Sequence, residues 1–285
     1  VVLPSNNKYY MKSNVLGYPR IGEKRELKKA NESFWAGKIS EEELLAVAEN
    51  IRVHNWTLQR EAGVELIPSN DFSFYDQMLD FSFTVNAIPE RFAPIHKLRD
   101  LERYYALARG YQKDGIDITA MEMTKWFDTN YHHLVPEIGP DTPISFADRT
   151  IVERFLAANE EGTVVRPVLV GPVTFLAVAK ADEATPDYDP FERLDDVVAA
   201  YADVLAELAE AGAPWVQIDE HALASDNLHV DRATLIEYST RVFRALAALE
   251  KRPAIFAAIG YGDGSRAAAS LASTGIEALG LDLCR

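Results

Sequence analysis

The sequence predicts an α/β fold, a (β/α)8 TIM-type barrel that is truncated before its eighth strand. Short apolar runs alternate with amphipathic helical stretches, as in a parallel sheet whose strands are connected by helices. Acidic residues such as Asp71, Asp219 and Asp263 follow predicted strands, and in a barrel these strand ends form the ligand-binding face. No G-x-G-x-x-G motif follows the first strand, so a dinucleotide-binding fold is disfavoured.

Local patterns define the elements of the first half of the chain. Ser40 and Glu43 have the spacing of a capping box, which indicates a helix that begins there and runs through Ile51. A second helix is predicted over 99–110. The predicted strands of this half are 16–21, 66–68 and 119–126.

The second half alternates more regularly between strand and helix. Apolar residues from Leu194 to Leu208 recur at the spacing of one buried helix face, and Gly212 is a natural end for that helix. The other predicted helices are 231–249 and 265–273, and the predicted strands are 166–170, 215–219, 254–259 and 278–283.

About seven strands are predicted in all, whereas a closed barrel of this type has eight. An open parallel edge leaves backbone donors and acceptors unpaired, so we expect the chain to be a truncated piece of a longer protein. The expected division is an N-terminal tail over 1–14 and an incomplete barrel over 15–285. An open sheet of the same strands is the alternative.

Composition and charge exclude several classes of protein. The chain has 285 residues, a net charge of −15 and an isoelectric point of about 4.9, which disfavours nucleic acids and anionic membranes as partners. No apolar run reaches the ~20 residues of a membrane span, and the N-terminus lacks a signal-peptide core. Cys284 is the single cysteine, so no internal disulfide can form. These features predict a cytoplasmic protein.

The segment from Met121 to Glu137 combines several aromatic rings with a lysine and two histidines. Lys125 there either binds a carboxylate beside an aromatic wall or is a surface lysine whose stem packs on apolar groups. His132 and His133 are adjacent on an extended segment, so they face opposite ways and are not expected to share a metal ion. The sequence therefore predicts no metal site.

The stretch from Gly22 to Lys29 is basic and coincides with a predicted helix start. Arg25 can fork onto a carboxylate, and Lys28 lies about one turn further along the same face. A helix N-terminus also favours anions. The stretch is either an anion clamp or a solvated helix face with ion pairs one turn apart.

Two further patterns remain open at this level. Asp219, Glu220 and His221 follow a predicted strand and form either an acid–base cluster or a helix cap with its hydrogen-bond network. The turn from Gly260 to Gly264 is rich in glycine, but it lacks the lysine and hydroxyl of a P-loop, so it supports phosphate binding only weakly.

Five blocks of the sequence, taken in order, resemble one family. The resemblance is to the N-terminal half of cobalamin-independent methionine synthase, and it extends from about residue 16 to the end of the chain. The blocks begin with LGYPRIGEKREL and its continuation (16–45), followed by LIPSNDFSFYDQMLD (66–80), MTKWFDTNYHHLVPE (123–137), RPVLVGPVTFL (166–176) and WVQIDEHAL (215–223).

The resemblance implies a methyltransferase that moves a methyl group from 5-methyltetrahydropteroyltri-L-glutamate to L-homocysteine without cobalamin. It implies two (β/α)8 barrels, of which the C-terminal barrel carries zinc on His and Cys ligands and the N-terminal barrel helps to bind the folate polyglutamate. The positions that match the family's folate-binding residues are Arg25, Glu26, Leu27, Lys28 and Lys125. No catalytic residue and no zinc ligand is matched, so the chain alone is expected to be inactive.

The chain departs from the family pattern at two places. His221 stands where the family's IDEPAL motif has proline, so the turn loses a fixed φ. Residues 257–261 lack the His-x-Cys pair of the catalytic barrel, and Cys284 is not expected to replace it. Two other functions stay open: a structural barrel that supports the catalytic one, and a stand-alone enzyme with Asp219 and Glu220 as acid and base.

Overall fold

A parallel sheet of five strands forms the centre of the computed structural model, which describes residues 2–5 and 8–283. Neighbouring strands run in parallel register, and Gln217, for example, lies opposite Val168 on one side and Phe256 on the other. In spatial order the strands are β13 (Ala278–Leu281), β12 (Ala254–Ile259), β11 (Trp215–Asp219), β9 (Val165–Val170) and β3 (Ile67–Ser69). The α/β class with a parallel sheet is therefore confirmed.

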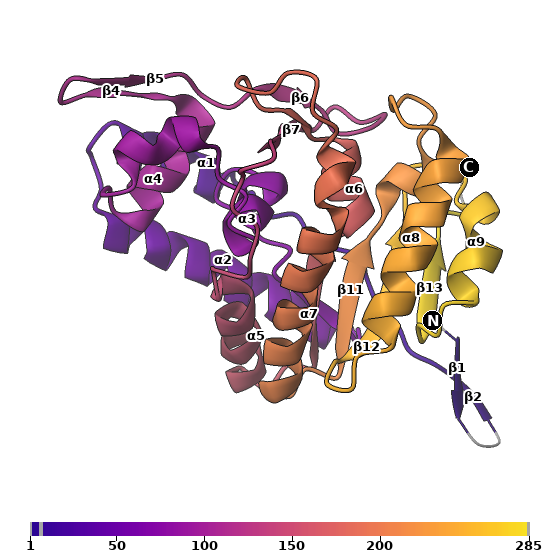
Figure 1. Ribbon diagram of the computed structural model, residues 1–285. Coiled ribbons are helices and arrows are strands. Elements are labelled where there is room, and N and C mark those ends of the chain that lie inside the picture. Colours follow the sequence, from indigo (N-terminus) through magenta and orange to yellow (C-terminus); the bar gives the residue numbers. More distant parts are fainter. Residues whose placement is uncertain (1, 6–7, 284–285) are drawn as a thin grey trace.

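The helices that follow these strands lie side by side along the sheet (Figure 1). Their apolar faces bury a core that contains the ring of Phe81. The centroid of this ring lies 5.1 Å from that of the Phe175 ring and 5.2 Å from that of the Tyr201 ring. This arrangement is expected where amphipathic helices cover a parallel sheet. The helices are α5 (Thr150–Glu160), α6 (Pro172–Ala177), α7 (Leu194–Glu210), α8 (Arg232–Ala247) and α9 (Ser265–Ala272).

A second lobe of helices lies beside the sheet, at the left of Figure 1. Its apolar cluster includes Leu79, Phe92 and Leu107. The predicted capping box is present, since Ser40 Oγ accepts the Glu43 N–H at 3.2 Å and Glu43 Oε2 accepts the Ser40 N–H at 2.7 Å. The elements of the lobe are α1 (Glu26–Trp35), α2 (Glu41–Glu61), η1 (Glu90–Ile95), α4 (Asp100–Arg109) and the hairpin of β4 (Tyr111–Lys113) and β5 (Ile116–Ile118).

Short elements complete the described chain. They are α3 (Gln77–Thr84), β6 (Met123–Lys125), β7 (His132–Leu134), β8 (Glu137–Ile138), β10 (Lys180–Ala181), η2 (Pro190–Arg193) and η3 (His221–Ala224). Where a tail was expected, β1 (Val2–Ser5) and β2 (Lys8–Met11) form an antiparallel hairpin. Cys284 lies outside the described residues, and no described helix is both long and apolar enough to span a membrane.

The strand predicted at 16–21 is wrong. The segment is irregular, and only an isolated β-bridge at Asn14 precedes it. Side chains from the sheet satisfy its backbone, because Arg166 of β9 and Gln217 of β11 donate hydrogen bonds to the carbonyl oxygens of 15–16 at 2.8 and 3.0 Å. The segment therefore runs beside the sheet without joining it.

The barrel strand predicted at 119–126 is also wrong. The strand found there, β6, pairs in antiparallel register with β7, so that Lys125 lies opposite His132. All three β6 residues are exposed, and a strand with nothing to bury gains little from a place inside a sheet. The central sheet thus contains five of the about seven strands that were predicted for a barrel.

Candidate functional site

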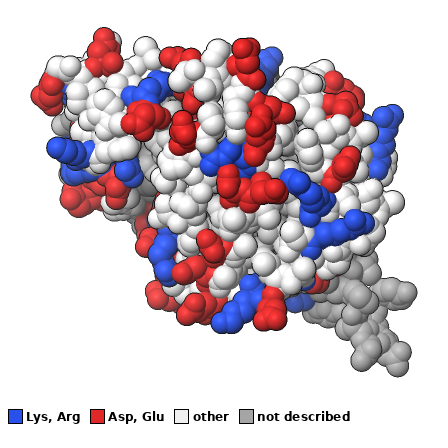
Figure 2. Space-filling view, viewed as in Figure 1, with Lys and Arg blue, Asp and Glu red and all other residues white. Residues whose placement is uncertain are grey.

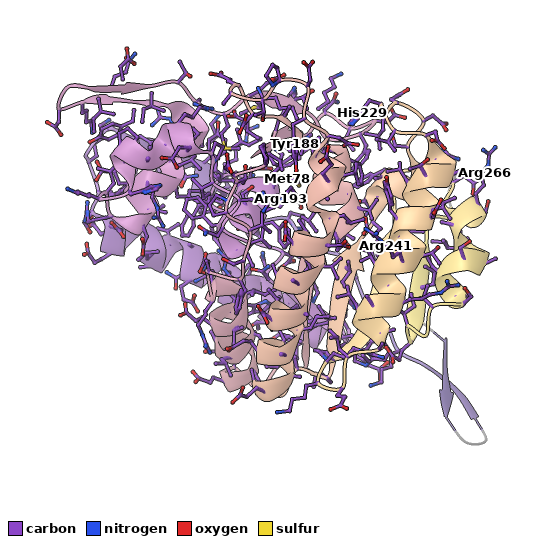
Figure 3. The ribbon with its side chains drawn as sticks, in the orientation of Figure 1. Met78, Tyr188, Arg193, His229, Arg241 and Arg266 are labelled. Atoms are coloured by element: carbon purple, nitrogen blue, oxygen red, sulfur yellow. The ribbon has the colours of Figure 1, made fainter. Side chains whose placement is uncertain are left out.

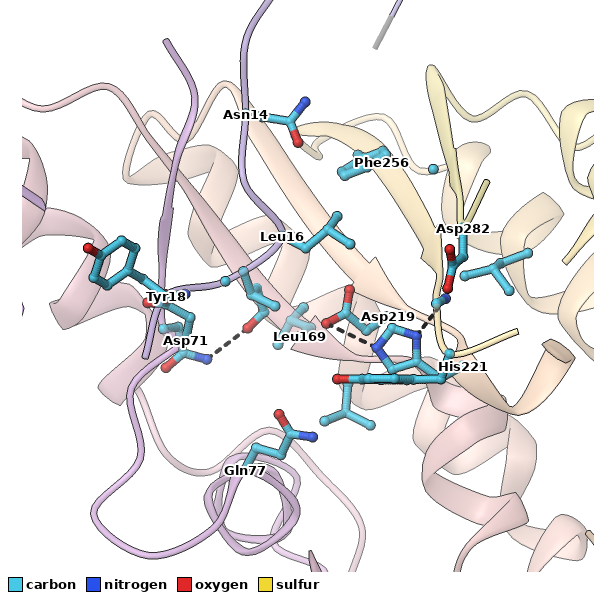
Figure 4. Close-up of a pocket in the computed structure, with 18 of the residues that line it drawn as sticks. Asn14, Leu16, Tyr18, Asp71, Gln77, Leu169, Asp219, His221, Phe256 and Asp282 are labelled. Atoms are coloured by element: carbon cyan, nitrogen blue, oxygen red, sulfur yellow. Dashed lines mark hydrogen bonds and ion pairs between the residues drawn. The ribbon is translucent and has the colours of Figure 1, made fainter. Parts of the chain in front are cut away.

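A cavity of about 980 Å³ lies at the carboxyl ends of the parallel strands (Figure 4). Each of the five strands contributes a residue at or just after its end to the cavity wall: Asp71, Val170, Asp219, Ile259 and Asp282. Strand ends of a parallel sheet are the usual place for ligands. The prediction that acidic residues gather at this face is therefore confirmed by the positions of Asp71, Asp219 and Asp282.

Two carboxyl groups in this cavity are held in place by neighbouring donors. Asp71 accepts the Tyr18 N–H at 2.8 Å, and Asp219 accepts a hydrogen bond from Gln217 Nε2 at 2.6 Å. Burial raises the pKa of Asp71 to about 6 and that of Asp219 to about 7. Beneath them, Arg166 is fully buried and donates to the Gln217 side chain at 2.5 Å.

Glu220 does not act as a partner for Asp219 in this cavity. Its carboxylate accepts the N–H groups of Val173 and Thr174 at 3.1 and 2.8 Å, and the Thr174 hydroxyl at 2.7 Å. Those donors lie in the first turn of α6, so Glu220 closes a helix start inside the core. Burial raises the pKa of Glu220 to about 7. The geometry supports the capping interpretation over the acid–base pair.

A second cavity, of about 670 Å³, adjoins the first. His221 and Tyr261 line both cavities, and their rings meet edge to face with centroids 4.7 Å apart. His221 Nδ1 accepts the Gly260 N–H at 3.0 Å. Burial lowers the pKa of His221 to about 4, so the ring is neutral near pH 7 and forms part of the wall between the cavities.

Lys125 lines this second cavity from the exposed strand β6. Phe127 and Tyr261 line the same cavity with their ring centroids 6.2 Å apart and stacked, so aromatic rings lie beside the lysine. Of the neighbouring aromatic residues Trp126, Phe127 and Tyr131, only Phe127 lines this cavity. Among the described residues Lys125 has no ion-pair or hydrogen-bond partner. An ammonium in this position is available to an anion from outside the chain.

The side chains of the stretch around Arg25 differ in their exposure to solvent. Arg25 precedes α1 with φ 61°, and Lys28 is exposed with Glu32 at 3.8 Å. Glu26 turns back and accepts the Lys24 N–H at 2.9 Å. Leu27, in contrast, is fully buried. None of these side chains lines either cavity, so the structure does not bring Arg25 and Lys28 into one cavity with Lys125.

A hydrogen-bond network connects the segment before the Arg25 turn with the β6–β7 hairpin that carries Lys125. Sequence reasoning missed this network. Arg20, before the Arg25 turn, donates to the Tyr75 carbonyl at 2.6 Å and to the Tyr131 hydroxyl at 3.3 Å. The Tyr131 hydroxyl donates to Asp76 at 3.2 Å, and Asp76 also accepts the Leu134 N–H at 3.1 Å. The position of Asp76 before α3 is a cap signal that could have been found, but its contacts with the β6–β7 hairpin could not.

The two adjacent histidines of β7 differ in their exposure. His132 is exposed whereas His133 is 2% exposed, so the two rings face opposite sides of the hairpin as predicted. Across 2–5 and 8–283, no three His, Cys, Asp or Glu side chains are grouped so that they could hold a metal ion.

Figure 2 shows acidic side chains over much of the visible face, with separate basic ones between them.

Comparison with known proteins places the chain in a family. Residues 12–285 match the family model described as the cobalamin-independent synthase, N-terminal domain. A 5-methyltetrahydropteroyltriglutamate–homocysteine methyltransferase from Mycobacterium bovis is 44% identical over 95% of this chain and 34% of its own length. A protein of the same name from Cytophaga hutchinsonii is 49% identical over 77% of this chain and 28% of its own.

A solved structure shows the same fold at low sequence identity. A protein from Listeria monocytogenes, proposed to be a vitamin-B12-independent methionine synthase, superimposes with a TM-score of 0.61 and 17% identity. The match covers 95% of this chain and 74% of that one. The chain spans about a third of the length of the Mycobacterium relative (34%).

Proposed function

The chain belongs to the cobalamin-independent synthase family, whose N-terminal domain it matches, and from this premise we propose that it binds the folate substrate of a methyltransferase. The ligand is 5-methyltetrahydropteroyltri-L-glutamate, and the complete enzyme transfers its methyl group to L-homocysteine. The relatives named for this reaction support the proposal. The observation that carries it is an exposed Lys125 with no partner among the described residues, beside an aromatic wall on an acidic protein.

The five matched residues divide into two roles. Arg25, Lys28 and Lys125 bind carboxylates of the glutamate tail, because these cations are exposed and carboxylates are their natural partners. Glu26 holds the turn that presents Arg25, and Leu27 anchors α1 in the core. The tail of three glutamates is long enough to contact cations in separate places, which suits the separation of Lys125 from Arg25 and Lys28.

The domain works as part of a longer enzyme. We assign 15–285 to an incomplete (β/α) barrel that packs against a C-terminal catalytic barrel, with 1–14 as an N-terminal tail. The greater length of the relatives supports this assignment. Zinc and its ligands are assigned to the C-terminal barrel, as the resemblance to the methionine synthase family implies. Cobalamin is not used, and the cytoplasm is the proposed compartment.

Calorimetric titration with 5-methyltetrahydropteroyltri-L-glutamate tests the proposed ligand. A variant with Arg25→Ala, Lys28→Ala and Lys125→Ala is expected to bind about a hundredfold more weakly, since each lost charged contact costs about 1 kcal/mol. A matched control removes three exposed cations outside the predicted site, with Lys38→Ala, Arg244→Ala and Lys251→Ala. Equal weakening in both variants would mean that only net charge matters. No binding by the parent chain would favour the alternative of a purely structural barrel.

The purified chain is expected to transfer no methyl group to homocysteine. Thiol activation in this reaction requires a zinc-bound thiolate, and residues 257–261 lack the His-x-Cys pair that the resemblance places in the catalytic barrel. Methionine formation from homocysteine and the methyl-folate, followed with and without added zinc, is the measurement. Zinc-dependent turnover by this chain alone would refute the expectation.

A further inference from the structure

His133 is a buried polar side chain that the proposed function does not use. Its residue is 2% exposed, and neither ring nitrogen has a hydrogen-bond partner among the described residues. The ring meets Trp126 edge to face at 5.2 Å, which satisfies neither nitrogen. A buried polar group without a partner costs free energy, so a ligand that pairs with it would recover that cost.

The same histidine lines the second cavity, which the side chains of two exposed cations also line. Lys125 reaches the cavity from β6, and Arg266 reaches it from the first turn of α9. Arg266 is exposed and is labelled near the end of α9 in Figure 3. Within 2–5 and 8–283 neither side chain has an ion pair within 4 Å or a hydrogen bond, although Arg266 interacts electrostatically with Asp263. Arg232 lines the cavity too, but it is paired with Asp226.

The acids of this cavity limit the kind of anion that it can hold. The charged residues that line it are three cations and three acids, namely Lys125, Arg232 and Arg266 with Asp128, Asp226 and Asp263. Asp226 is occupied by Arg232, and Asp263 accepts the Ser265 N–H at 2.9 Å. Because the total charge is balanced, a singly charged carboxylate is favoured over a doubly charged phosphate.

We propose that the second cavity is a carboxylate site in which His133 and Arg266 bind together with Lys125. The ligand class is a chain of carboxylates, and its identity as the glutamate tail of the methyl-folate rests on the proposed function. Burial lowers the pKa of His133 to about 4, so near pH 7 the ring is neutral and donates through one nitrogen. The three side chains belong to β6, β7 and α9 and line one cavity.

The backbone around the cavity fits a shaped site. Phe127 and Tyr261, whose rings stack against each other, both have positive φ, at 45° and 68°. Bulky residues rarely adopt this conformation, and such strain is concentrated at functional sites. The two rings form an apolar part of the cavity wall. A wall of this kind excludes water and strengthens each contact with a carboxylate.

Two single variants and one control test the proposal by calorimetry with the methyl-folate triglutamate. Arg266→Ala, at an exposed position, is expected to weaken binding about tenfold. Arg244→Ala removes an exposed arginine of α8 that lines neither cavity and should leave the affinity unchanged. His133→Leu should weaken binding while the melting temperature stays equal or rises, because it removes an unpartnered polar group. A structural histidine would instead lower the melting temperature.

A second probe separates this site from the proposed function. Glutarate, a simple dicarboxylate, should shift the His133 imidazole resonances in a saturable NMR titration of the parent and not of Arg266→Ala. If the folate binds but Arg266→Ala and His133→Leu match the parent, the carboxylate site is overturned and the proposed function stands. If glutarate binds and the folate does not, the proposed function is overturned and the carboxylate site stands. If neither ligand binds, both are overturned.

Discussion

Glu220→Ala is expected to lower the free energy of unfolding by about 3–5 kcal/mol, because it leaves three buried donors without an acceptor, each costing about 1–3 kcal/mol. The donors are the N–H groups of Val173 and Thr174 and the Thr174 hydroxyl. The folded-state pKa of Glu220 is raised to about 7, so its favourable contribution is fully present below its unfolded pKa and is lost as the pH rises through 7. The variant should therefore lose more stability at pH 5 than at pH 8, as measured by urea denaturation.

Gly171 provides the control for this prediction. A Cβ on Gly171 would lie 2.2 Å from Glu220 Cδ, so Gly171→Ala should destabilise the parent strongly by overlap. The Glu220→Ala substitution removes the atoms that overlap with this Cβ. The double variant should therefore lose less unfolding free energy than the sum of the losses of the two single variants. Strictly additive costs would contradict the packing of Glu220 against Gly171.

The elements that could be predicted are those that local sequence determines. β12 is a continuous apolar run, and β11 begins with apolar residues at Trp215 and Val216, as is usual for buried parallel strands. The start of α2 is fixed by Ser40 and Glu43, which contact each other directly. In each case the residues that carry the signal also make the contact, so the prediction was confirmed.

The two strand predictions were wrong because the contacts that decide these segments come from residues outside them in the sequence. The backbone where the segment at 16–21 begins depends on Arg166 and Gln217, whose hydrogen bonds to the carbonyls of Val15 and Leu16 span 151 and 201 positions of the chain. The β6 strand is similarly decided by its hairpin partner and by the absence of anything to bury. Local composition cannot distinguish a barrel strand from an exposed hairpin when the deciding contacts are remote.

The candidate site was predictable in its residue types and not in its arrangement. Motif resemblance supplied Arg25, Lys28 and Lys125, but it did not separate their roles from that of buried Leu27. Arg266 belongs to no motif, and it becomes interesting only because α9 brings it to the cavity of Lys125. A site built from several strand ends and hairpins is a property of the fold, which single-sequence patterns describe only in part.

The β6–β7 hairpin that carries Lys125 leads directly into a buried ion pair. Glu137, in β8, is 1% exposed and is held bidentately by Arg91, with Nε–Oε2 at 2.8 Å and Nη2–Oε1 at 2.7 Å. The same guanidinium donates to the Thr119 and Ala120 carbonyls at 2.6 and 3.3 Å. Arg91 thus holds both ends of the chain segment that contains the hairpin.

Arg91→Ala is expected to cost about 3–5 kcal/mol of unfolding free energy, because a buried carboxylate left without its partner is strongly destabilising. Arg91→Lys should recover only part of this loss, since an ammonium cannot form the two parallel bonds. Arg91→Met with Glu137→Met should recover more, because an apolar pair leaves no buried charge. Denaturant titration of the four proteins measures these differences. If Arg91→Ala cost under about 1 kcal/mol, as an exposed ion pair would, the Glu137 carboxylate would have to reach water, and the base of the Lys125 hairpin would be open in solution.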